Sequence, residues 1–257
     1  MIILENVSFM RQNKQILNDI DLHVKAGQHW VLMGLNGSGK STLLSIVSGQ
    51  NWPTTGQVQV LGETFGQTRM PDLKKRMGWV GSTLNTRINQ YDTVERIVLS
   101  GMFASIGIYQ DYTPDDLADV QQVLSSLNIS HLSPKKYLEC SQGQQQMVLI
   151  ARALVAKPEL LILDEPCNGL DLFATEQILA LIQALIQDDA SPTIIFVTHH
   201  ISQIIPEFSH CLLLKDGNIY QQGPTKKLLN TATLSDFYDQ DVTVIETERQ
   251  RYIAYID

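Results

Sequence analysis

The sequence predicts an α/β fold in which short parallel strands, buried on both faces, alternate with helices. Two continuous apolar runs, at 160–163 and 193–198, are typical of such strands, and the periodic segment 172–187 between them predicts a helix. A further apolar run at 29–34 leads into a glycine, and helical periodicity follows at 41–48. These patterns together predict strand–helix–strand units of one sheet.

Composition narrows the class of protein. The 257 residues suffice for a sizeable core, and 44% apolar and 18% charged residues are ordinary globular values. No apolar run reaches the length of a membrane span, and no signal peptide is visible. Three scattered cysteines indicate neither disulfides nor a zinc site, which favours the cytoplasm. A formal net charge of −8 disfavours broad phosphate-backbone binding, so no nucleic-acid partner is expected.

The remaining segments differ in their hydrophobic patterns. Residues 1–33 predict short strands, and 86–156 are mostly helical in pattern, with Pro114 near a helix start. The tail from about 226 predicts a helix followed by two alternating stretches at 241–257 that suit a small β-hairpin.

Residues 34–41, GLNGSGKS, match the phosphate-binding pattern G-x-x-x-x-G-K-[ST] in full. A chance match in a glycine-rich turn is the alternative, but the preceding strand and following helix are the context that the motif requires. Its glycines let the backbone wrap a phosphate at a helix N-terminus, Lys40 supplies a cation, and the Ser41 hydroxyl suits Mg²⁺. The expected nucleotide-binding residues here are Gly34, Leu35, Asn36, Gly37, Ser38, Gly39, Lys40, Ser41 and Thr42.

Two more strands end in side chains suited to nucleotide chemistry. Asp164 and Glu165 follow the apolar run at 160–163, at the sheet edge where α/β folds bind ligands. Asp164 is expected to hold Mg²⁺ and Glu165 to polarise the attacking water, with a helix-capping acid pair as the alternative. His199 and His200 end the run at 193–198; His199 suits a γ-phosphate sensor, His200 a structural role, and a core histidine is the alternative for both.

The stretch CSQGQQQMVLIAR at 140–152 predicts a second helix N-terminus. Ser141 and Gln144 have the spacing of a capping box, and an apolar stripe follows. Gly143 lets another backbone or a phosphate approach, which predicts an anion site separate from the first one. Gln145 and Gln146 are interpreted as little more than a polar first turn.

These motifs in this order, with NGLD at 168–171, resemble the ATP-binding-cassette (ABC) ATPases over about residues 1–225. The resemblance implies a P-loop NTPase (RecA-like) core at 1–85 and 157–225 with an antiparallel β subdomain, an inserted α-helical subdomain at about 86–156, and a C-terminal extension at 226–257. It also implies ATP and Mg²⁺ as cofactors.

The same resemblance implies a head-to-tail pairing around two nucleotides, with a second copy or a paired ABC ATPase subunit. Asp171 would lie at the dimer interface. Contacts to the partner's nucleotide would come from Ser141, Gln142, Gly143 and Gln144.

The sequence departs from the family pattern at three places. Arg11 stands where an aromatic residue usually stacks on adenine, and a guanidinium plane can also stack there. Ser82 stands where a glutamine usually contacts metal and water, and it is the expected third metal ligand. The signature begins with Cys140 and has Gln142 in place of its first glycine.

The leading hypothesis is therefore an ATP-hydrolysing subunit that drives a separate integral-membrane permease from the inner face of the cell membrane. The segment 98–109 is expected to dock the permease, with a helix packed into its own core as the equal alternative. A soluble mechanochemical or regulatory ATPase acting on ribosomes or DNA is the second hypothesis, and a slow nucleotide switch the third.

Overall fold

Residues 1–188 and 191–256 are described by the computed structural model, in which the chain divides into two units. Unit 1 consists of Met1–Leu73 and the chain from Thr193 onward, and unit 2 of Lys74–Pro192. The subdomain boundaries expected at about residues 86, 156 and 226 stay predictions.

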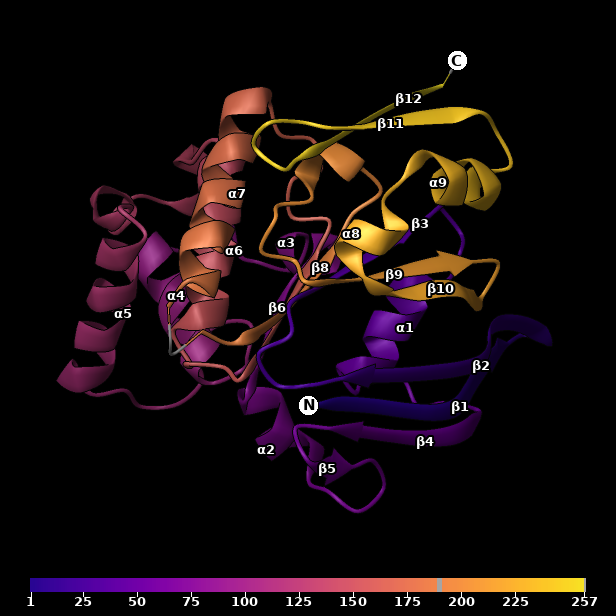
Figure 1. The fold of residues 1–257 in the computed structure, drawn as a ribbon. Helices are drawn as coiled ribbons and strands as arrows, with labels where there is room; N and C mark the ends of the chain where they lie inside the picture. Colours follow the sequence, from indigo (N-terminus) through magenta and orange to yellow (C-terminus); the bar gives the residue numbers. More distant parts are fainter. Residues whose placement is uncertain (189–190, 257) are drawn as a thin grey trace. The chain divides into compact units, whose positions relative to one another are not determined.

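An antiparallel sheet forms the N-terminal part of unit 1, with strand order β2-β1-β4-β5. In Figure 1, β1, β2 and β4 lie side by side. A two-residue turn joins β1 to β2, and Gln12 and Asn13 both have positive φ there (51° and 60°), which suits a tight hairpin. The strands are β1 (Ile2–Arg11), β2 (Lys14–Val24), β4 (Thr55–Val60) and β5 (Glu63–Thr64).

The second sheet of unit 1 is built around β3, which pairs in parallel with β8 on one side and β9 on the other. β10 adds an antiparallel strand beyond β9. All five residues of β3 and of β8 are buried, as their apolar runs predict for parallel strands covered on both faces. The strands are β3 (Trp30–Gly34), β8 (Thr193–Val197), β9 (His210–Lys215) and β10 (Asn218–Pro224).

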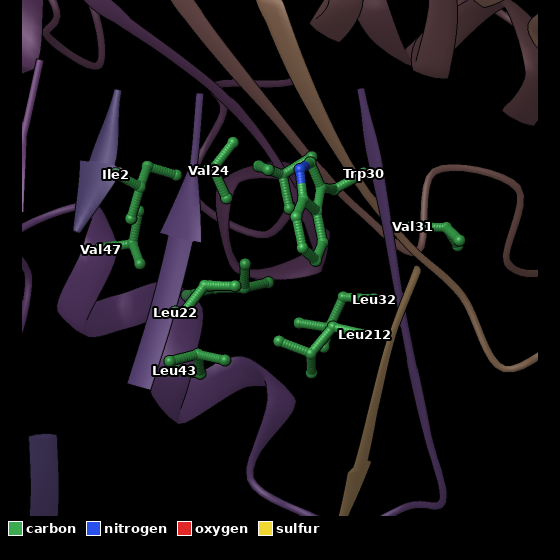
Figure 2. A pocket seen from close by; sticks show the side chains of 11 residues that line it. Ile2, Leu22, Val24, Trp30, Val31, Leu32, Leu43, Val47 and Leu212 are labelled. Carbon is green, nitrogen blue, oxygen red and sulfur yellow. The ribbon is translucent and has the colours of Figure 1, made fainter. Parts of the chain in front are cut away.

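Helix α1 (Lys40–Val47) packs its apolar side chains against β2 and β4 of the antiparallel sheet and against β3 of the parallel one. Leu43 and Leu22 point into a shared space with Trp30, next to a small cavity of about 20 Å³ (Figure 2). The cavity has room for about one water molecule, but its lining is entirely hydrophobic, so it should stay dry. It is part of the core under α1 and offers no polar group to a ligand.

The C-terminal tail ends in the hairpin that its alternating pattern predicts, because β11 and β12 pair antiparallel with Ile245 opposite Ile253. The Arg251 guanidinium fastens the hairpin by donating to the Ser202 carbonyl at 2.7 and 3.2 Å. The elements are η3 (Ile201–Gln203), α8 (Thr225–Leu228), α9 (Thr231–Tyr238), β11 (Val242–Glu246) and β12 (Tyr252–Ile256).

Unit 2 combines a parallel strand pair with helices. β6 pairs in parallel with β7, and Met77 lies opposite Leu160. Helix α6 packs against α4, where Gly101 approaches the backbone of Arg152 so closely that a Cβ would lie 2.0 Å from the Arg152 carbonyl oxygen. Besides α2 (Met70–Lys75), at the boundary of the units, the elements are β6 (Met77–Val80), α3 (Ser82–Asn85), α4 (Val94–Met102), α5 (Pro114–Ser126), η1 (Ser130–Leu132), η2 (Tyr137–Glu139), α6 (Gln142–Leu154), β7 (Leu160–Asp164) and α7 (Leu172–Ile186).

Side-chain caps set the starts of the long helices of unit 2. Thr113 caps α5 in a capping box, and Pro114 occupies the first turn as predicted. Ser141 caps α6 in a second capping box, and Asp171 caps α7 by accepting from the Ala174 amide at 2.8 Å. None of the described helices is long and apolar enough to span a membrane.

Candidate functional site

The glycine-rich loop at 34–41 follows β3 directly and opens α1. The Lys40 ammonium donates to the carbonyls of Gly34 at 2.8 Å and Leu35 at 3.1 Å. These two bonds connect the end of the loop to its beginning. Gly39, the residue before α1, has a φ of 104°, a conformation that side chains rarely adopt. The loop therefore has the closed shape that its motif predicts.

Neighbouring strands of unit 1 hold the loop in place. The Gly217 amide, in the turn after β9, donates to the Ser38 carbonyl at 3.0 Å. A Cβ on Gly39 would lie 2.8 Å from Leu17 Cδ2 and 3.1 Å from the Ile16 carbonyl oxygen of β2. Glycine is thus required at position 39 for space as well as for backbone conformation.

Two groups at the loop are suited to receive an anion. In the part of the chain that the structure describes, the buried Ser38 hydroxyl has no hydrogen-bond partner, an arrangement that normally costs free energy. At the start of α1, Gly39 provides no side-chain cap for the first-turn amides. A phosphate bound there would satisfy both. Ser41 is exposed and Thr42 is half-buried, so a ligand at the surface could reach both residues.

The strand end at His199 shares its sheet edge with the loop. β8 runs parallel to β3, with Leu32 opposite Val197, and the Thr198 amide donates to the Leu32 carbonyl at 3.2 Å. The core-histidine alternative is wrong for both histidines: His199 is half-buried, and His200 is exposed. Their rings lie 4.0 Å apart between centroids.

Arg11 ends β1 opposite Lys14, and its side chain is exposed. The structure therefore leaves the Arg11 guanidinium accessible, and its contact with adenine stays a prediction.

The acid pair lies at the carboxyl end of β7 in unit 2. Asp164 and Glu165 are both half-buried, and Glu165 has a φ of 51°, an uncommon conformation that often marks functional residues. The Asn168 side chain donates to a Glu165 carboxylate oxygen at 3.4 Å. A Cβ on Gly81 would lie 3.2 Å from Asp164 Cβ, so the segment after β6 comes close to Asp164. Ser82 follows this glycine and begins α3; its side chain lies outside the described part of the structure.

The predicted capping box at Ser141 is present. The Ser141 hydroxyl accepts from the Gln144 amide at 3.3 Å, and the Gln144 side chain accepts from the Ser141 amide at 3.0 Å. Ser141 and Gln142 are exposed. Gly143 does permit a close backbone approach, and the partner is α7, because a Cβ on Gly143 would lie 2.9 Å from the Ala174 Cβ.

A groove of about 930 Å³ runs along this end of unit 2. Its lining includes Ser141, Gly143 and Gln144 together with Asp171 and Phe173, whose side chain is 81% exposed. The structure therefore brings the signature residues and the NGLD loop together within one unit. A Cβ on Gly169 of that loop would lie 2.7 Å from the side-chain nitrogen Nε2 of Gln142.

The sequence left two interpretations of the segment 98–109 open, permease docking and packing into the core, and its two parts differ in burial. Residues 98–101 are buried, so the core-packing interpretation is correct for them. Residues 102–109 are half-buried or exposed, up to 85% at Tyr109, and permease docking stays a prediction for this part. Arg152, whose pKa burial lowers to about 10, ties the segment to α6 by donating to Ser100 Oγ at 3.2 Å and to the Ser105 carbonyl at 2.7 Å.

Sequence reasoning missed one set of contacts near the signature. Gln145 lies in the polar first turn of α6 as interpreted, but it does more than that, because its side chain donates to the Tyr137 carbonyl at 3.1 Å. Tyr137 in turn donates from its hydroxyl to the Asn85 side chain at 2.9 Å. The only sequence signal was an aromatic residue shortly before the signature, which does not identify a partner 52 residues away.

Comparison with known proteins agrees with this geometry. The sequence profile described as ABC transporter matches residues 17–168. An uncharacterized ABC transporter ATP-binding protein of Lactococcus lactis, YmeB, is 41% identical over 98% of each chain. A dimeric post-hydrolysis structure of the ATP-binding cassette MJ0796, bound to ADP and Pi, has a TM-score of 0.74 at 26% identity, over 87% of this chain and 98% of that one. The structure of cbiO1 from Clostridium perfringens, part of the ABC transporter complex cbiONQ, has a TM-score of 0.79 at 26% identity, over 91% and 92%.

The fold and the glycine-rich loop thus define a P-loop NTPase of the α/β class. The chain belongs to the ABC transporter family, as an ATP-binding subunit with ATPase activity.

Proposed function

We propose that two copies of this ATPase, or this chain and a paired ABC ATPase subunit, close head to tail around two ATP molecules. The loop at 34–41 of one chain and the Ser141 turn of the other would hold each nucleotide. The observation that carries the proposal is the N-terminus of α6, which is capped yet exposed at Ser141 and lines a groove. An exposed helix N-terminus attracts anions, so a phosphate held by the other chain could bind there. The dimeric cassette among the similar structures supports this arrangement.

In each site, the amides at 36–42 would hold the phosphates at the N-terminus of α1, and Lys40 would neutralise their charge. The Ser38 hydroxyl would gain the partner that it lacks among the described residues. Arg11 would stack on the adenine. His199 would contact the γ-phosphate from the strand end beside the loop.

Ser41, Asp164 and Ser82 would hold Mg²⁺, which neutralises charge on the phosphate oxygens when bound. Among the described residues, no three histidine, cysteine or acidic side chains form a metal cluster. That fits Mg²⁺, which in nucleotide sites takes most of its ligands from phosphates and water. Glu165 would accept a proton from the attacking water.

The ATPase would act on a separate membrane permease, with the exposed part of residues 102–109 as the docking surface, at the inner face of the membrane. The family and its complexes, such as cbiONQ, support a permease as the partner.

Mixing two inactive variants tests the shared site. Lys40→Met removes a P-loop cation and Ser141→Arg blocks a signature turn, so each variant alone should hydrolyse little ATP. A mixed dimer keeps one complete site if the signature acts across the interface. With random pairing, half of the dimers are mixed and each has one of two sites, so about a quarter of the wild-type rate should return.

A mixture that stays inactive would contradict the proposal. Glu165→Gln provides the control for chemistry, because it should bind ATP and form dimers without turnover. Removing divalent cations with EDTA should abolish the wild-type rate if Mg²⁺ is required.

A further inference from the structure

Tyr137 links two parts of unit 2 that the proposed function places at different nucleotide sites. Its side chain is fully buried at the start of η2, four residues before Ser141. Its hydroxyl donates to Asn85 Oδ1 at 2.9 Å, and Asn85 ends α3, the short helix that begins at Ser82. Burial raises the pKa of the Tyr137 hydroxyl, so the group stays neutral and remains a donor at physiological pH.

The first turn of α6 holds Tyr137 from the other side. Gln145 donates from its side chain to the Tyr137 carbonyl at 3.1 Å. The Gln145 amide donates to the Ser141 carbonyl at 2.8 Å, so Gln145 belongs to the same turn as the capping box. Asn85, Tyr137 and Gln145 together form a continuous connection, named here the Tyr137 bridge.

The backbone of Tyr137 has further anchors. The Tyr137 amide donates to the Asp92 carbonyl, and the Leu138 amide to the Gln90 carbonyl, both at 3.0 Å. Because these bonds and burial already fix Tyr137, its hydroxyl is not needed to hold Tyr137 in place. The bond to Asn85 instead fixes the end of α3, which is otherwise a single short helical turn.

We propose that Tyr137 is a positioning residue for ATP hydrolysis. Through its hydrogen bond to Asn85, it fixes the position of α3 relative to α6, the helix that the signature begins. The inference rests on the proposed roles of Ser82 at the metal and Ser141 across the interface. The bridge makes the placement of Ser82 in one site depend on the signature turn that serves the other site. It thereby connects the two nucleotide sites through a single chain.

Removing the hydroxyl alone tests the bridge. Tyr137→Phe keeps the ring, and Asn85→Leu removes the acceptor. Each should lower kcat about 5- to 30-fold, the effect of one lost positioning hydrogen bond, while KM for ATP changes far less. Asn85→Asp keeps an oxygen acceptor and should retain most of the activity. The double variant Tyr137→Phe/Asn85→Leu should be no slower than the slower single variant, because both remove the same bond.

The matched control is Tyr91→Phe, which removes the hydroxyl of a tyrosine that is 73% exposed in the same unit and should leave kcat unchanged. A wild-type kcat for Tyr137→Phe would overturn the inference. So would a double variant whose defect is the product of the two single defects.

The mixing experiment with Lys40→Met and Ser141→Arg assigns the effect to α3. The complete site takes its P-loop and α3 from the Ser141→Arg chain. Tyr137→Phe should therefore slow the mixture when it is placed on that chain and have little effect on the Lys40→Met chain. Equal slowing from either chain would overturn the inference, since it indicates a general structural defect. An inactive mixture without Tyr137→Phe would contradict the proposed function instead, and the kcat comparison would still decide on the bridge.

Discussion

Gly143 in the first turn of α6 approaches Ala174 of α7 so closely that a Cβ on Gly143 would lie 2.9 Å from the Ala174 Cβ. The Ala174 amide donates to Asp171, so the contact joins the caps of both helices. The direction of the missing Cβ shows that the glycine serves the packing of α6 on α7. The open side of Gly143 remains available to the groove that it lines.

Gly143→Ala should therefore push the two helix starts apart. We expect a loss of about 1–3 kcal/mol in the free energy of unfolding, as for overpacked contacts, together with a lower kcat. The double variant Gly143→Ala/Ala174→Gly removes the clash and should regain both stability and ATPase rate, measured by urea unfolding and steady-state kinetics. If stability returns without activity, Gly143 is instead required beside the phosphate itself.

Ser38 gives a second prediction, because its buried hydroxyl has no partner among the described residues. Ser38→Ala should leave the nucleotide-free protein as stable or raise its free energy of unfolding by about 1 kcal/mol, since an unsatisfied buried group is removed. The same variant should bind ATP more weakly, so ATP should raise its Tm less than it raises the wild-type Tm. Thermal unfolding with and without ATP measures both effects. An equal ATP-induced rise in the two proteins would contradict a phosphate contact by Ser38.

The parts of the site that sequence predicts are local in the chain. The loop at 34–41 and the capping box of Ser141 and Gln144 each lie within a few residues, and their geometry follows from residue type and spacing. The parallel strands can also be predicted from the sequence, because β3 and β8 are continuous apolar runs that end in polar loops. Secondary structure and the candidate ligands therefore follow from the sequence.

Contacts between distant segments of the chain could not be predicted from the sequence. Tyr137 reaches Asn85 across 52 residues, and Gly101 packs on Arg152 across an interval of similar length. Such pairs depend on how helices pack, and no periodicity encodes their partners. The same holds for Gly143, since a glycine in a signature suggests a ligand until the neighbouring helix is known.

Arg152 carries a third prediction. It is 8% exposed, and its guanidinium donates to Ser100 Oγ and to the Ser105 carbonyl. Arg152→Met should lower the free energy of unfolding by about 2 kcal/mol or more, because hydrogen bonds to a charged group are lost and the Ser105 carbonyl loses its donor. Ser100→Ala removes one of the two Arg152 contacts and the bond that Ser100 Oγ donates to the Ile97 carbonyl at 2.6 Å, but it leaves the Ser105 contact in place and should cost about 1 kcal/mol. Urea unfolding of both variants checks this order, and equal losses would contradict the larger role of Ser105.

Acid stability provides the last prediction, which concerns His29 in unit 1. Its ring is buried, and Nδ1 accepts from the Ile194 amide at 3.2 Å, so the ring is neutral there. Burial lowers the pKa of His29 from its usual 6.5. The unfolded chain therefore binds more protons than the folded chain, and stability present above pH 6.5 should be lost as the pH falls toward the folded pKa.

His29→Asn places an oxygen acceptor near the position of Nδ1 but does not titrate. We expect it to reduce the loss of unfolding free energy between pH 7.5 and pH 5.5, measured by urea unfolding at several pH values. The pKa of His210 is also lowered, by burial and then by Lys25, so part of the pH dependence should remain. His23→Asn, on an exposed histidine of β2, controls for the substitution itself and should leave the dependence as in the wild type. If His29→Asn has the same pH dependence as His23→Asn, the buried ring does not control acid stability.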